Sequence, residues 1–125
     1  MQLRAIHTPG HTDESMCYLL LGEVLFTGDT LFPTGVGRPD LDASPEEARA
    51  RAEALYHSLH KLLALPGSTL VLAGHTSTPV PFDRVPVMKT LAEVEEQVAL
   101  LHVSRSDFVL LNPLQKLCRT YLLCG

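Results

Sequence analysis

The sequence predicts a single small domain of the α/β or α+β class. Short β-like runs come first, and an amphipathic helix, a further strand and more helices follow them. Of the 125 residues, 46% are apolar and only 19% are charged, which is enough apolar sequence for one hydrophobic core. A disordered chain would have fewer apolar residues and more charge.

The N-terminal part predicts three short strands and a loop. Residues 3–6 are typical of a strand. Residues 17–21 and 24–27 suit a β-hairpin whose two-residue turn begins at Gly22. Residues 28–43 contain three glycines, two prolines and several aspartates, which is the composition of a loop. A loop of this length inside a compact domain is usually functional.

A helix is predicted to begin after Ser44. Ser44 can cap it, Pro45 suits its first position, and Glu47 completes a capping box. Apolar residues then recur every three or four positions, which predicts one buried helix face formed by Ala48, Ala52, Leu55, Leu59 and Leu62. Pro66-Gly67 ends the helix.

The rest of the chain predicts one more strand and two more helices. Residues 68–73 form an apolar β-like run. Capping boxes that begin at Thr90 and Ser104 predict helices that end near positions 101 and 112. The Leu-rich residues 113–125 form a tail of uncertain structure.

Charge and cysteine usage exclude several function classes. The net charge of −4 leaves no basic excess for a nucleic-acid partner. No apolar run reaches about 18 residues, and the N-terminus has no signal-peptide pattern, so no membrane span is expected. Cys17, Cys118 and Cys124 are scattered and odd in number, which indicates free thiols in a reducing compartment and predicts a cytoplasmic protein.

Metal-capable side chains follow three of the predicted strands. His11 lies in a Pro-Gly turn after the first strand, while Asp29 and His75 each follow an apolar run that ends in glycine. Ligand and catalytic residues are commonly placed at strand ends in α/β folds. Taken singly, each histidine could instead be an ordinary loop residue and Asp29 a turn or capping residue. Three such strand ends together favour a site.

His7, at the end of the first strand, has two interpretations of equal weight. It can orient a ligand or hydrogen-bond a carboxylate from outside the coordination shell, or it can be a plain strand residue.

The motifs around these residues resemble the metallo-β-lactamase superfamily. Thr8-Pro9-Gly10-His11-Thr12, Leu25-Phe26-Thr27-Gly28-Asp29-Thr30-Leu31-Phe32 and Gly74-His75 are similar to its third, fourth and fifth motifs. Gly35-Val36-Gly37-Arg38-Pro39-Asp40-Leu41 resembles a segment of the glyoxalase II and persulfide dioxygenase branch. The residues after His75 differ from the glyoxalase II pattern, which favours the dioxygenase side.

The resemblance covers roughly residues 3–110 and implies a fold. Residues 1–112 would form the C-terminal half of an αββα sandwich, with one mixed sheet and flanking helices. The His-x-His-x-Asp-His motif, which in the family precedes the segment around His11, does not occur in this sequence. We therefore expect a truncated form with an incomplete metal site.

The resemblance also implies roles for individual residues. His11 corresponds to a metal ligand, and Asp29 to the aspartate that bridges two metals or binds a single iron, which makes it the expected catalytic residue. His75 corresponds to a ligand of the second metal in two-metal members. Arg38 and Asp40 would lie on the loop beside the site, where Arg38 would hold the loop or an anionic substrate, or would form a surface salt bridge.

Two chemistries are compatible with these ligands. One or two Zn²⁺ ions would activate water for attack on a thioester, whereas a single Fe²⁺ would bind oxygen and a persulfide. Both imply a small sulfur-containing, glutathione-type substrate. A catalytic zinc usually has three protein ligands, so we expect weak metal binding and little activity from this chain alone.

The alternative is a non-catalytic half-domain that acts as an interaction or assembly module. Half a sandwich would leave one apolar sheet face without its cover, which favours a homo-oligomer or a complementing chain that supplies the missing half.

Overall fold

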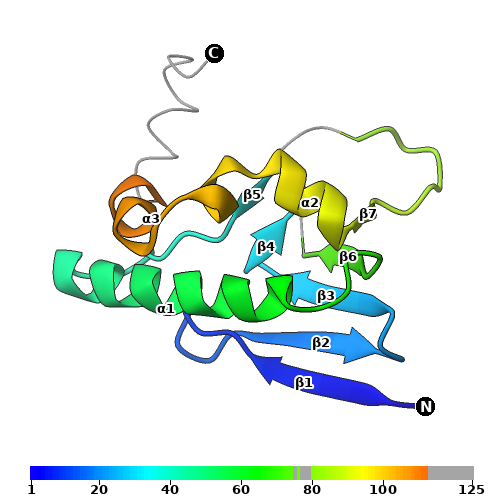
Figure 1. The fold of residues 1–125 in the computed structure, drawn as a ribbon, viewed down its shortest axis with the longest axis horizontal. Helices are drawn as coiled ribbons and strands as arrows, with labels where there is room; N and C mark the ends of the chain where they lie inside the picture. Colours follow the sequence, from blue (N-terminus) through cyan, green and yellow to red (C-terminus); the bar gives the residue numbers. More distant parts are fainter. Residues whose placement is uncertain (75, 77–79, 113–125) are drawn as a thin grey trace.

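The computed structural model describes residues 1–74, 76 and 80–112, and it confirms a mixed α+β fold (Figure 1). Five strands form one sheet in the order β1-β2-β3-β6-β7. Its strands are β1 (Leu3–His7), β2 (Met16–Leu20), β3 (Val24–Gly28), β6 (Leu70–Ala73) and β7 (Lys89–Thr90). The sheet is mixed because β3 and β6 are parallel, whereas the other neighbouring strands are antiparallel.

The predicted hairpin forms between β2 and β3, but its turn lies one residue earlier than predicted. Leu21 and Gly22 occupy the two central positions with φ of 54° and 68°, and the Glu23 amide donates to the Leu20 carbonyl over 3.0 Å. Two successive left-handed residues match the twist of a hairpin. Gly22 adopts this conformation easily, and Leu21 adopts it at a conformational cost.

The predicted loop at 28–43 contains a second, smaller hairpin. Strands β4 (Leu31–Phe32) and β5 (Gly35–Val36) pair antiparallel as a separate sheet. Two-residue strands have too little sequence for a period-2 pattern to be recognised, and the buried side chains of Leu31 and Val36 fix this hairpin against the core.

Helix α1 (Pro45–Leu63) follows the prediction closely. The Ser44 hydroxyl accepts the Glu47 amide over 3.2 Å, and all five residues of the predicted stripe are buried. Helix α3 (Arg105–Leu111) begins, as predicted, at the Ser104 cap.

The helix predicted from Thr90 to about 101 is divided. Helix α2 (Leu91–Gln97) ends at Val98, whose φ of −98° and ψ of 100° are extended, and a 3-10 turn (Ala99–His102) follows. The break still leaves Val98 and Leu101 buried. Strand β7, just before α2, was not predicted.

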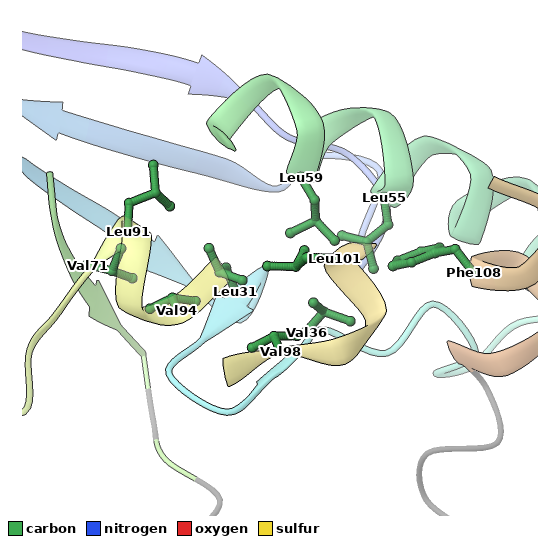
Figure 2. Close-up of a cluster of buried hydrophobic side chains, with 10 residues drawn as sticks. All are labelled: Leu31, Val36, Leu55, Leu59, Val71, Leu91, Val94, Val98, Leu101 and Phe108. Atoms are coloured by element: carbon green, nitrogen blue, oxygen red, sulfur yellow. The ribbon is translucent and has the colours of Figure 1, made fainter. Parts of the chain in front are cut away.

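Two apolar clusters form the core between the sheet and the helices. The larger one contains Leu31, Val36, Leu55, Leu59, Val71, Leu91, Val94, Val98, Leu101 and Phe108 (Figure 2). The smaller one contains Ile6, Cys17, Leu19, Leu25 and Leu62. Burial raises the pKa of the Cys17 thiol, and this cysteine is free. Both clusters include residues of α1, so this helix joins them.

The two faces of the sheet differ in their cover. The side of the sheet beneath the helices is called the inner face here. It carries the buried side chains of Ile6, Cys17, Leu19, Leu25 and Val71. We call outer face the opposite side, which carries Leu3, Tyr18, Leu20, Phe26 and Leu72. Within the described residues nothing covers Leu3, Tyr18 and Phe26, which are 56%, 42% and 40% exposed. Among those residues, too, no helix is long and apolar enough to cross a membrane.

Candidate metal centre

The loop between β1 and β2 places His11 at one end of the sheet. The loop is closed by backbone hydrogen bonds from Thr8 to Ser15 (2.9 Å) and from Gly10 to Thr12 (3.0 Å). Gly10 has a φ of 144°, and a Cβ built on it would lie 2.3 Å from the Leu55 Cβ of α1. Only glycine can occupy this position, because the loop backbone lies directly against the helix.

Asp29 is placed by the turn that ends β3. The register of β3 against β6 shifts between Phe26 and Gly28, and Gly28 adopts a φ of 50°. Such a bulge redirects the side chains that follow it. The buried Thr27 hydroxyl donates to the Leu31 carbonyl over 2.7 Å and closes the turn. The Asp29 carboxylate is therefore presented at the same end of the sheet as His11.

His11 and Asp29 meet across a small pocket. The His11 Nε2 lies 3.7 Å from the Asp29 Oδ2, and their side chains are 17% and 43% exposed. The pocket has a volume of about 220 Å³. Its wall is formed by His11, Asp29, Phe32, Val36, Gly37, Arg38 and Leu41. The pocket thus combines His11, Asp29 and Arg38 with the apolar side chains of Phe32, Val36 and Leu41, a mixture typical of binding sites.

The hydrogen bonding of His11 leaves its Nε2 available. The His11 Nδ1 lies 2.9 Å from the Arg38 carbonyl oxygen, and a carbonyl can only accept, so Nδ1 carries the proton. In a neutral imidazole the other nitrogen, Nε2, then has a lone pair, and it is this atom that faces Asp29. In metal-binding histidines, the ring nitrogen that does not bind the metal typically donates a hydrogen bond of this kind.

The separation of the two donor atoms fits a metal ion. Bonds from zinc to histidine nitrogen and carboxylate oxygen are about 2.0–2.2 Å long, so two ligands of one tetrahedral ion lie about 3.4 Å apart. The 3.7 Å between the His11 Nε2 and the Asp29 Oδ2 is close to this value. Within residues 1–74, 76 and 80–112, no group of three or more histidine, cysteine or acidic side chains gathers as a complete set of ligands.

Two glycines allow the backbone to pack closely against Asp29 and His11. A Cβ on Gly37 would lie 2.2 Å from the Asp29 carbonyl oxygen and 3.1 Å from the His11 Cβ. Gly74 donates its amide to the Gly28 carbonyl over 2.7 Å, and a Cβ on it would lie 3.1 Å from the Asp29 Oδ1. His75, the third predicted ligand, follows Gly74 directly but lies outside the described residues.

Arg38 and Asp40 bind each other. The Arg38 Nε and Nη2 donate to the two carboxylate oxygens of Asp40 over 3.1 and 2.9 Å, and Asp40 raises the pKa of Arg38. The salt bridge that was one of the expected roles of Arg38 is therefore present. Because the Arg38 carbonyl accepts from His11, this ion pair lies on the loop that holds the His11 ring.

His7 does not contact the pocket residues. Its Nε2 lies 2.9 Å from the Asp13 carbonyl oxygen, so the ring braces the loop that carries His11. The contacts made by Gly37 and by the Arg38 carbonyl were not foreseen, because a backbone contact has no side-chain signature in a sequence.

A larger recess of about 740 Å³ lies between the start of α1 and α3, and neither His11 nor Asp29 lines it. It is mainly apolar and contains no histidine. The smaller pocket is therefore the better candidate for chemistry.

Known proteins resemble this chain in sequence and in fold. A family model described as metallo-beta-lactamase superfamily matches residues 2–75. Hydroxyacylglutathione hydrolases of Brucella ovis and Brucella abortus are 42% identical over 78 residues, which are 62% of this chain and 27% of theirs. The chain thus spans about a quarter of the length of these curated relatives.

Solved structures show the same fold. A metallo-beta-lactamase from Staphylococcus aureus subsp. aureus COL is similar with a TM-score of 0.73 and 27% identity, over 86% of this chain and 33% of that one. The BLEG-1 B3 metallo-beta-lactamase gives a TM-score of 0.61 and 31% identity, over 81% of this chain and 42% of that one.

Proposed function

The chain belongs to the metallo-beta-lactamase superfamily, and from this premise we propose that it contributes His11 and Asp29 to a metal centre that hydrolyses the thioester of a glutathione conjugate. The observation that carries the proposal is the placement of the His11 Nε2 lone pair 3.7 Å from the Asp29 carboxylate in a pocket. The hydroxyacylglutathione hydrolases supply the substrate class, since they are named for an acylglutathione.

Each pocket residue has a proposed task. His11 would bind the metal through Nε2, and Asp29 would bind it through its carboxylate. A bound Zn²⁺ supplies the Lewis acidity that makes a water molecule nucleophilic near neutral pH. Phe32, Val36 and Leu41 would exclude other water from the reacting group.

Two protein ligands are fewer than a catalytic zinc usually has. We propose His75 as a further ligand, since Gly74 before it packs against Asp29. We propose that another layer of polypeptide brings the remaining ligands and covers the outer face. The exposed apolar side chains Leu3, Tyr18 and Phe26 support this, and the same face also supports the alternative role as an assembly module. The free, buried Cys17 fits a cytoplasmic location.

A persulfide dioxygenase with Fe²⁺ is the second candidate. It is favoured by the residues after His75, which differ from the glyoxalase II pattern. The metal distinguishes the candidates: hydrolysis would follow added Zn²⁺, whereas oxygen consumption with a glutathione persulfide would follow added Fe²⁺.

The test is the rate at which an S-acylglutathione loses its thioester with saturating Zn²⁺. We expect a low rate above that of Zn²⁺ alone, and a loss of more than about tenfold in Asp29→Asn, because even supporting residues of metal sites have effects of that size. The matched control is Asp83→Asn, which alters an exposed aspartate of a loop outside the pocket. Equal Zn²⁺ affinities together with equal rates for the wild-type chain and Asp29→Asn would overturn the proposal.

A further inference from the structure

Arg51 of α1 contacts both loops that form the mouth of the pocket. Its Nη1 donates to the Leu41 carbonyl over 3.0 Å, and Leu41 lines the pocket. Its Nε lies 3.6 Å from the Asp13 Oδ1, in the loop that carries His11. The Arg51 side chain is only 21% exposed, so the guanidinium is held between the two loops.

The same two loops meet again at the candidate metal ligand. The His11 Nδ1 donates to the Arg38 carbonyl, which joins loop 8–15 to loop 37–43 inside the pocket. Arg51 joins the same loops from the helix side. A change in the separation of the loops would therefore stretch the bond that keeps the proton of His11 on Nδ1.

We propose that Arg51 is a positioning residue that fixes the tautomer and direction of His11 by tying these two loops together. The proposal rests on the proposed function in one respect, because it assumes that the Nε2 of His11 is the atom that binds a metal. Its structural part, the tie between the loops, does not depend on any metal.

The rest of α1 already holds one of the loops, which explains why Arg51 is needed for the other. Three further contacts run along the helix against residues 7–10: the Lys61 Nζ to the His7 carbonyl (2.9 Å), the Ser58 hydroxyl to the Pro9 carbonyl (2.8 Å), and Leu55 against Gly10. Helix α1 contacts loop 37–43 through the hydrogen bond from Arg51 to the Leu41 carbonyl. We therefore expect loop 37–43 to respond more strongly to the loss of Arg51.

The two contacts of Arg51 differ in strength. The bond to the carbonyl has an ordinary length of 3.0 Å and a charged donor. The Asp13 carboxylate, in contrast, is 81% exposed and 3.6 Å away, so water screens that ion pair. Asp13→Asn should consequently change the tautomer of His11 and the amide exchange of loop 37–43 only slightly. Arg51→Met should change both strongly. Arg51→Lys keeps the charge but lacks the fork that reaches two acceptors, so it should restore the wild-type behaviour only in part.

The test measures the ¹⁵N chemical shifts of the two ring nitrogens of His11 in the metal-free chain, in mildly alkaline buffer. Amide hydrogen exchange is measured on the same samples. We expect the Nδ1–H tautomer in the wild type. In Arg51→Met we expect a mixture of tautomers, severalfold faster exchange at residues 38–41, and a severalfold higher dissociation constant for Zn²⁺. Arg49→Met is the matched control, because Arg49 lies on the same helix, is 76% exposed and pairs only weakly with Glu53.

The outcomes separate this inference from the proposed function. An unchanged tautomer and unchanged exchange in Arg51→Met would overturn the role of Arg51, even if zinc still binds. Loosened loops in Arg51→Met but not in Arg49→Met would support it, even if the chain hydrolyses no thioester. If Arg51→Met does not fold, the same comparison is made with Arg51→Lys, and a wild-type spectrum there would contradict the proposal.

Discussion

The two faces of one sheet carry similar side chains and have different surroundings. Leu25 and Phe26 are neighbours on β3, yet Leu25 is completely buried beneath α1 and Phe26 is 40% exposed. Strands with apolar residues on both sides are typical of sheets covered on both faces. The sequence of these strands is therefore suited to cover on both faces of the sheet, and the described residues cover one of them.

The largest expected effect is on the inner face. Leu25→Ala should lower the free energy of unfolding by about 2–5 kcal/mol, because it removes a buried side chain and leaves a cavity. Chemical denaturation monitored by circular dichroism would measure it. A loss below about 1 kcal/mol would mean that the inner face is not the core that we describe.

A smaller effect is expected at the site, where the inner face ends. Gly37→Ala would place a Cβ 2.2 Å from the Asp29 carbonyl oxygen, and overpacking of this kind costs about 1–3 kcal/mol. Because the clash lies between Asp29 and His11, zinc binding should weaken as well. Gly67→Ala is the control, since its added Cβ would meet only the Ala92 side chain, at 3.2 Å. Equal zinc affinity in both variants would contradict this view of the site.

The smallest effect on the fold is expected on the outer face. Phe26→Thr keeps a residue that favours strands and should change the free energy of unfolding by less than about 1 kcal/mol. It should also lower self-association at high concentration, which light scattering would detect. If the wild-type chain gives a sharp monomer peak at high concentration, the outer face is not a contact surface between copies.

The sequence predicted the elements whose signals are local. Helix α1 has its cap, its stripe and its stop within the helix and its flanking residues, and the β2–β3 hairpin follows from two apolar runs around a glycine. The meeting of His11 and Asp29 was also predictable, because both follow strands. The break at Val98, the short strands β4, β5 and β7, and the hydrogen bond from His11 to the Arg38 carbonyl depend on tertiary contacts. No local pattern marks them.

The proposed function requires that the His11 Nε2 and the Asp29 carboxylate bind one metal ion. The most direct test is a Zn²⁺ titration of the ¹⁵N-labelled chain, with the histidine ring nitrogens observed. We predict that the Nε2 signal of His11 shifts with added zinc while its Nδ1 keeps its proton, and that Asp29→Asn weakens this response by more than about tenfold. A response confined to the exposed His57 and His60, or one at His11 that Asp29→Asn leaves unchanged, would contradict the proposed function.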